Sequence, residues 1–226
     1  MKKIFSTLMC AVFALTASAQ NSPVFSSTGK PDLPVTIGIR GGLNFANFST
    51  SISGISIDMD SRTAFHAGMI VDIPLVKSLY VQPGLFISSK GSSNKALASQ
   101  IYGGKAEVVY RPIYLELPIL ASGRIDFSDN LQLQVNFGPY FAYGIGGTST
   151  LKANGIETEG NFFDDDDVNA FDMGLQVGGG LTFCKHIYLG VAYEFGLINI
   201  VDDKSKNYYG VSAKNSNFMI SLGYNF

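Results

Sequence analysis

The chain has 226 residues, a formal net charge of −2, 15% charged residues, 25 glycines and a mean hydropathy of +0.19. This length accommodates one domain or one barrel of modest size. The mildly acidic balance gives no electrostatic basis for nucleic-acid binding, and we expect none. The low fraction of charged residues and the many glycines favour a fold of many strands interrupted by glycines over a charged helical bundle.

The first 19 residues are organised like a secretory signal peptide. Two lysines follow Met1, residues 4–15 form an apolar core, and Ala17-Ser18-Ala19 is a small-residue cleavage site. We therefore expect export through the Sec pathway, cleavage near Ala19, and a loose periplasmic lead over residues 20–34. After this segment no apolar run approaches the roughly 20 residues of a spanning helix. The rest of the chain contains only Cys184, which excludes an intramolecular disulfide.

Eight segments alternate between apolar and polar residues. We expect strands at 35–49, 63–75, 79–89, 111–125, 131–146, 170–184, 187–200 and 215–226. Alternation with a period of two predicts strands that have one apolar face. Pro83, Pro118 and Pro139 fall inside three of these segments, and we expect them to mark bulges or strand ends near the rims.

The connections also alternate in length. Short links near 76–78, 127–130 and 185–186 alternate with long polar segments at 50–62, 90–110, 147–169 and 201–214. Outer-membrane barrels have short periplasmic turns, longer extracellular loops and an even number of strands. The sequence therefore predicts an all-β fold over residues 35–226: an eight-stranded antiparallel transmembrane β-barrel, an up-and-down meander of the OmpA/OmpX type.

The last strand carries the clearest signal of cellular location. Its apolar face ends on a terminal aromatic residue and consists of Phe218, Ile220, Leu222, Tyr224 and Phe226. This pattern resembles the C-terminal signal strand by which bacterial outer-membrane barrels are recognised and inserted. We therefore expect an outer-membrane protein that contacts the barrel-assembly machinery during insertion, and then outer-membrane lipids and lipopolysaccharide.

A soluble lipocalin-like barrel is the main competing fold, because it has the same number of strands. Its apolar face would have to point inward, and an eight-stranded interior holds only its own side chains or one small ligand. The aromatic-rich face of this chain would not fit there, so we expect it to face lipid. Aromatic residues near strand ends are expected at the membrane interfaces: Phe48, Tyr143, Phe183 and Phe226.

Two motifs and the last strand suggest a family. The segments Gly38–Phe45 (GIRGGLNF) and Tyr114–Leu120 (YLELPIL), together with the Phe-terminated end, resemble the PorT-type, or "porin family", barrels of Bacteroidota. The resemblance spans roughly residues 35–226. It implies an eight-stranded outer-membrane barrel without an established molecular activity, and the porin label does not by itself imply a pore.

Six ionisable residues fall on the face expected to line the lumen: Arg40, His66, Asp72, Glu116, Asp172 and Glu194. Unpaired charges in a narrow interior are unfavourable, so we expect Arg40 to form a network with the carboxylates, or water to fill the space. Such a network is either a structural plug or a gate on a narrow ion path.

Other possible chemistry is weaker. His66 with Ser88 or Ser89 could form a dyad, but it would face the lumen rather than lipid, and His186 falls in a turn at the periplasmic end. The run of Asp164, Asp165, Asp166 and Asp167 is either a solvated loop or a divalent-cation site, although it lacks a recognised calcium-loop pattern. We expect no catalytic residue, metal or cofactor.

The most favoured function is therefore structural or interaction-based. We expect a monomeric integral barrel whose polar lumen is mostly plugged. The barrel would act through its extracellular loops, and the sequence does not identify a partner for them. The alternative is a narrow channel for small solutes or ions, and a lipid-modifying enzyme ranks third.

Overall fold

The protein was analysed as a computed structural model. It describes residues 34–52, 55–57, 59–76, 78–95, 98–99, 106–163, 168–201 and 211–226. The predicted signal peptide and almost all of the predicted lead lie outside these ranges. Among the described residues, no helix is long and apolar enough to cross a membrane.

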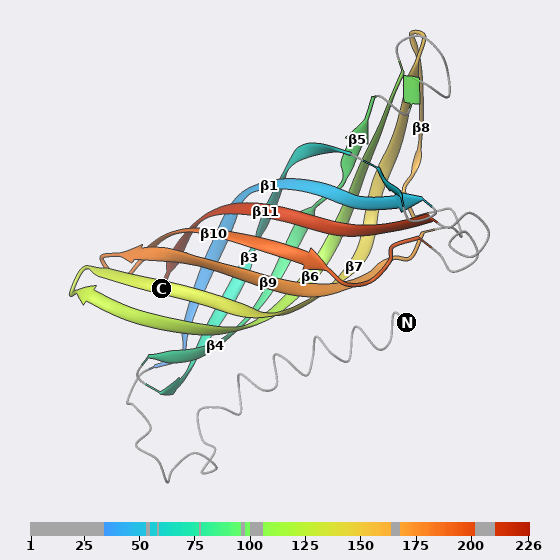
Figure 1. Cartoon of the computed structure of the whole chain (residues 1–226). Helices are drawn as coiled ribbons and strands as arrows, with labels where there is room; N and C mark the ends of the chain where they lie inside the picture. The colour runs from blue at the N-terminus through green and yellow to red at the C-terminus, as the bar shows by residue number, and fades with distance from the viewer. Residues whose placement is uncertain are drawn as a thin grey trace.

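Eight strands form a closed antiparallel ring (Figure 1). They are β1 (Thr36–Ile52), β3 (Asp60–Val76), β4 (Leu79–Ser89), β6 (Ala106–Ser128), β7 (Leu131–Ala153), β9 (Phe171–Phe183), β10 (Ile187–Gly196) and β11 (Val211–Asn225). Each strand pairs with its neighbours along the chain, and β1 pairs with β11 from Gly38↔Asn225 to Ile52↔Val211. The predicted eight-stranded fold is confirmed. Closure leaves the ring without an open edge, as a strand structure in lipid requires.

The alternation of side chains puts the apolar face outside. On β11, Phe218, Ile220 and Leu222 are 39%, 39% and 60% exposed, whereas Asn217 and Met219 on the opposite face are at most 5% exposed. The same pattern recurs on the other ring strands, so large aliphatic and aromatic side chains cover the outer surface while polar ones fill the lumen. This is the arrangement expected of a membrane barrel and the reverse of a lipocalin.

The two ends of the barrel differ. At one end, which we call the turn end, the links β3–β4, β6–β7 and β9–β10 are tight, and β11 finishes there (Figure 1). The opposite end, which we call the loop end, carries the long connections, and parts of these are strands rather than loops. Three short strands lie there: β2 (Ile55–Ile57), β5 (Ser92–Asn94) and β8 (Ile156–Asn161).

The largest departure from the predicted boundaries is at β6, β7 and β8. β6 begins five residues before the predicted strand and β7 continues to Ala153, where Asn154 and Gly155 reverse the chain with φ values of 51° and 83°. Two consecutive positive φ values at an Asn-Gly pair are typical of a type I′ hairpin turn. The hairpin of β7 and β8 therefore projects beyond the ring (Figure 1).

The three prolines do not mark bulges or rims. Pro83, Pro118 and Pro139 lie within β4, β6 and β7, and the β4–β6 and β6–β7 registers are the same on both sides of them. The β6–β7 register instead shifts between Ile113 and Tyr114 and between Asp126 and Ser128. The expectation of bulges or strand ends at the prolines was therefore wrong.

Small residues make room for large ones inside the barrel. Gly180 on β9 pairs with Gly190 on β10, and both lie against the ring of Tyr188. A Cβ atom added at Gly180 would lie 2.6 Å from Tyr188 Cε2 and 2.5 Å from the Leu189 carbonyl oxygen. Glycine is thus required here by space.

We predict that Gly180→Ala destabilises the barrel by about 1–3 kcal/mol, the usual effect of overpacking. Gly146→Ala on β7 is the matched control, because an added Cβ there meets nothing within 4 Å. The measurement is urea-dependent unfolding in lipid vesicles, followed by the heat-modifiable shift in gel migration. Equal urea midpoints for the two variants would contradict this account of the packing.

Candidate functional site

The lumen near the loop end is organised around a buried lysine. The Lys90 ammonium lies 2.6 Å from Glu116 Oε2 and 2.9 Å from Glu194 Oε2, and all three side chains are at most 1% exposed. The ammonium also lies 4.3 Å from the centroid of the Tyr140 ring. Lys90 directly follows β4, Glu116 is on β6 and Glu194 is on β10. One cation therefore links the neighbouring strands β4 and β6 to β10 on the opposite side of the ring.

A third carboxylate lies beside this pair. Asp172, which is fully buried, accepts hydrogen bonds from Tyr140 Oη at 3.1 Å and from Asn215 Nδ2 at 2.9 Å. Asn217 Nδ2 donates to Glu194 at 3.1 Å. We use the name Lys90 cluster for Lys90, its three neighbouring carboxylates and the side chains that contact them: Lys90, Glu116, Glu194, Asp172, Tyr114, Tyr140, Asn215 and Asn217. Within the described ranges, no group of three or more His, Cys, Asp or Glu side chains is placed to hold a metal ion.

A second ion pair occupies the lumen toward the turn end. Arg124 Nη2 lies 2.6 Å from Asp72 Oδ1, and Gln82 Nε2 donates to the same oxygen at 2.7 Å. The Arg124 guanidinium also lies 4.0 Å from the centroid of the Tyr80 ring. Gln134 extends this layer by donating to Asn136 Oδ1 at 2.9 Å.

Arg40 is engaged differently from the sequence-based expectation. Its guanidinium donates to Asn225 Oδ1 at 2.7 Å and to the Ile39 carbonyl at 3.0 Å, and lies over the Tyr188 ring at 4.2 Å. Among the described residues it forms no ion pair within 4.0 Å, because Asp72 pairs with Arg124 instead. The expectation that Arg40 anchors the carboxylate network was therefore wrong.

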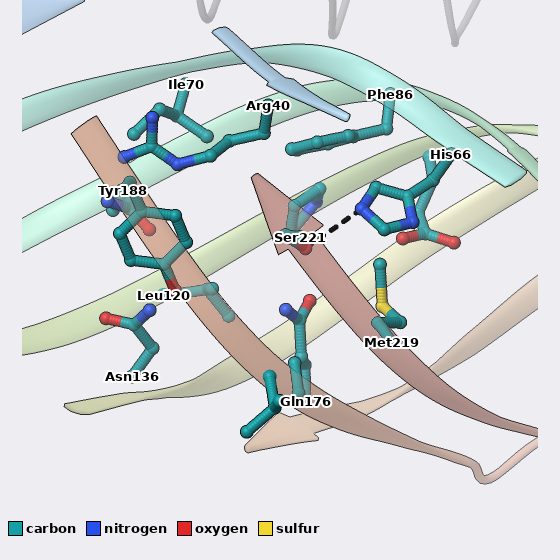
Figure 2. Close-up of a pocket in the computed structure, with 15 residues that line it drawn as sticks. Arg40, His66, Ile70, Phe86, Leu120, Asn136, Gln176, Tyr188, Met219 and Ser221 are labelled. Carbon is teal, nitrogen blue, oxygen red and sulfur yellow. Dashed lines mark hydrogen bonds between the residues drawn. The ribbon is translucent and has the colours of Figure 1, made fainter. Parts of the chain in front are cut away.

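His66 forms a polar chain with Ser221 and Asn44, and not the dyad with Ser88 or Ser89 that the sequence left as a weak possibility. Its Nε2 lies 2.9 Å from Ser221 Oγ (Figure 2). Its Nδ1 lies 2.7 Å from Asn44 Oδ1. Ser88 contacts Asn44 rather than the imidazole. The order Ser221–His66–Asn44 resembles a nucleophile, base and orienting group. However, His66 is 2% exposed and the adjoining cavity measures about 50 Å³, which holds a few water molecules and no lipid or peptide substrate.

An aromatic layer covers the Lys90 cluster at the loop end. Phe162 and Phe163 directly follow β8, and their ring centroids lie 4.9 Å apart. Phe162 packs on Phe48 at 6.3 Å, while Phe163 meets Tyr114 of the Lys90 cluster at 5.7 Å. Phe48 is only 5% exposed, because the alternation along β1 puts it on the same inner face as Asn44. The expectation that Phe48 lies at a membrane interface was therefore wrong.

Phe226, His186 and Cys184 lie at the turn end of the barrel, apart from the charged clusters of the lumen. Phe226 ends the chain at the turn end, and the exposed His186 lies in the β9–β10 turn, where its ring stacks on Tyr224. Cys184 is a free, exposed thiol in the same turn. The four aspartates, Asp164 to Asp167, lie outside the described residues.

Sequence reasoning missed two lumen cations, Lys90 and Arg124. Arg124 has the same strand parity as Glu116, which was a usable signal. Lys90 gave no such signal, because it lies beyond the last alternating residue of its strand and looks like the start of a polar loop.

We predict that Lys90→Met lowers the free energy of unfolding by about 3–5 kcal/mol, since it leaves buried carboxylates without their cation. The control is Lys152→Met, which removes an ammonium 3.1 Å from Glu157 at the surface and should cost at most about 1 kcal/mol. Urea titration in vesicles measures both. If Lys90→Met unfolds at the same urea concentration as Lys152→Met, the Lys90 cluster does not stabilise the lumen.

Several solved structures are similar to this chain. Ail of Yersinia pestis is 13% identical, covering 86% of this chain and 100% of its own, with a TM-score of 0.39. Neisserial surface protein A is 10% identical, covering 86% and 100%, with a TM-score of 0.45. OprG of Pseudomonas aeruginosa is 14% identical, covering 84% and 95%, with a TM-score of 0.42.

No curated protein sequence matches this chain significantly. The family described as the outer membrane protein beta-barrel domain, in contrast, matches residues 18–202, which is most of the chain. That match agrees with the closed ring, its apolar outer surface and its polar lumen. This chain therefore belongs to the outer membrane protein beta-barrel domain family, and its location is the outer membrane.

Proposed function

We propose that this protein is a non-conducting outer-membrane barrel that acts through its extracellular side. Outer-membrane barrels have short turns in the periplasm and longer connections outside, so the loop end is the extracellular end. The filled lumen is the observation that carries the proposal. Four layers fill the lumen in order from the turn end to the loop end: the Arg124–Asp72 pair, the His66 chain, the Lys90 cluster and the aromatic layer.

The layers include contacts between strands that are not paired with each other, and the Lys90–Glu194 ion pair crosses the lumen between opposite sides of the ring. His66 joins β3 to β11 through Ser221, and Lys90 joins the end of β4 to β6 and β10. Because these charges are paired and buried, an ion crossing the barrel would have to break them in succession. This arrangement supports a structural plug over a permanently open path.

A narrow channel is the second candidate. A hollow of about 570 Å³ opens at the turn end, and its lining includes Arg124, Gln132 and Thr182. The small cavity beside His66 lies further inside the lumen. A conducting state would have to connect these spaces and displace both the Lys90 cluster and the aromatic layer.

The finer sequence-based expectations are proposals as well. We propose that residues 1–19 direct Sec-dependent export, that cleavage follows Ala19, and that the chain is a PorT-type barrel of the kind found in Bacteroidota. The three-part N-terminal pattern and the GIRGGLNF and YLELPIL segments support these assignments.

We predict that the refolded barrel is silent in planar lipid bilayers at high salt. Heat-modifiable gel migration must first show that the preparation is folded, so that silence is informative. Reproducible discrete conductance steps, altered in Glu116→Gln, would reject the plug and favour the channel.

A further inference from the structure

Strand β8 offers one open backbone edge at the extracellular end. It pairs with β7 from Thr148↔Asn161 to Ala153↔Ile156, and among the described strands it pairs with no other. All six of its residues are exposed. β6 pairs with the other edge of β7 as far as Ala153, and the extension of β6, β7 and β8 rises above the other ring strands in Figure 1. The second edge of β8 is therefore not paired with a ring strand.

The register identifies the backbone groups on this edge. Ala153 and Ile156 flank the two-residue turn, so they form the hydrogen-bonded pair that closes the hairpin. In an antiparallel ladder the hydrogen-bonded and non-hydrogen-bonded pairs alternate. The N–H groups of Glu157 and Glu159 therefore point away from β7, toward the open edge.

The negative charge of β8 indicates which kind of partner strand would fit its open edge. Strand β8 contains two acidic residues, Glu157 and Glu159, and no lysine or arginine. Glu157 is paired with Lys152 across the hairpin, whereas Glu159, opposite Thr150, makes no ion pair among the described residues. A partner strand that carries basic residues would complement Glu159, since opposite charges stabilise cross-strand pairs.

A second copy of this chain fits the edge poorly. Antiparallel pairing of β8 with its own copy would bring the Glu157 and Glu159 side chains of both molecules onto adjacent positions. Like charges in such positions are destabilising. The acidic edge therefore disfavours a β8–β8 dimer and favours a different protein.

We propose that the β8 edge binds an extended, lysine- or arginine-bearing segment of an extracellular protein by strand addition. Main-chain hydrogen bonds supply the affinity in this mode of recognition, and alternate side chains supply the specificity. The inference rests on the proposed function, because it assigns a partner class to the extracellular side of a plugged barrel.

The test uses the refolded full barrel in zwitterionic detergent micelles. The probe is a dye-labelled octapeptide that alternates lysine with threonine and valine, and binding is followed by fluorescence anisotropy. Two control peptides carry glutamate in place of lysine, or N-methyl groups on every second residue. We expect saturable binding of the lysine peptide and no binding of either control.

Two substitutions of Glu159 distinguish the contribution of its backbone N–H to peptide binding from that of its charge. Glu159→Gln removes the charge but keeps the edge N–H, so binding should weaken about two- to fivefold. Glu159→Pro removes the N–H as well, so binding should weaken at least about tenfold. Glu157→Pro removes the neighbouring edge N–H and serves in its place if Glu159→Pro fails to refold.

The outcomes distinguish this inference from the proposed function. Equal binding of the N-methylated and unmodified peptides would overturn strand addition, as would equal affinities of the Pro and Gln variants. Absence of binding to a folded barrel that is silent in bilayers would overturn the edge proposal alone. Concentration-dependent dimers that Glu159→Pro abolishes would replace the hetero-partner with a second copy. Conductance steps in the bilayer would instead reject the proposed function.

Discussion

Closure of the ring through β1 and β11 is the constraint on which the rest of the structure depends. A strand structure in lipid must pair every backbone group internally, and only a closed ring does so. The antiparallel pairing from Gly38↔Asn225 to Ile52↔Val211 meets this requirement. With eight strands the ring is narrow, so the side chains that alternate inward must fill it themselves. The contents of the lumen therefore follow from the closure.

Filling a narrow polar lumen with charge requires pairing across the ring. Lys90 contacts two carboxylates from β6 and β10, and Arg124 contacts Asp72 from β3. Aromatic rings complement these cations, since Tyr140 lies under Lys90 and Tyr80 lies under Arg124. The same contacts that satisfy buried charges also hold distant strands at fixed positions. In the plug that we propose, stability and obstruction of the lumen thus arise from the same side chains.

The sequence predicted the fold well because alternation with period two is a local pattern. It placed all eight ring strands, and the third was predicted with its observed bounds, 79–89. It also placed Glu116, Asp172 and Glu194 on the inner face, where all three are buried. It could not predict their partners, because pairing depends on the stagger between strands far apart in the chain. Hence Arg40 was assigned carboxylates that the register gives to Lys90 and Arg124. The assignment of Phe48 to the membrane interface was a different error, because its alternation with Asn44 along β1 already indicated the inner face.

The hairpin of β7 and β8 at the loop end follows a different rule from the ring. Along β7 one edge is occupied by β9 as far as Tyr143 and then, from Thr148, by β8. Within the bilayer an unpaired edge is unfavourable because nothing else can satisfy its backbone groups. Beyond the bilayer water can satisfy them, so β8 can keep one edge open while the ring stays closed. Strand addition requires an open edge, and in the orientation that we propose this edge lies on the extracellular side, where a partner protein could reach it.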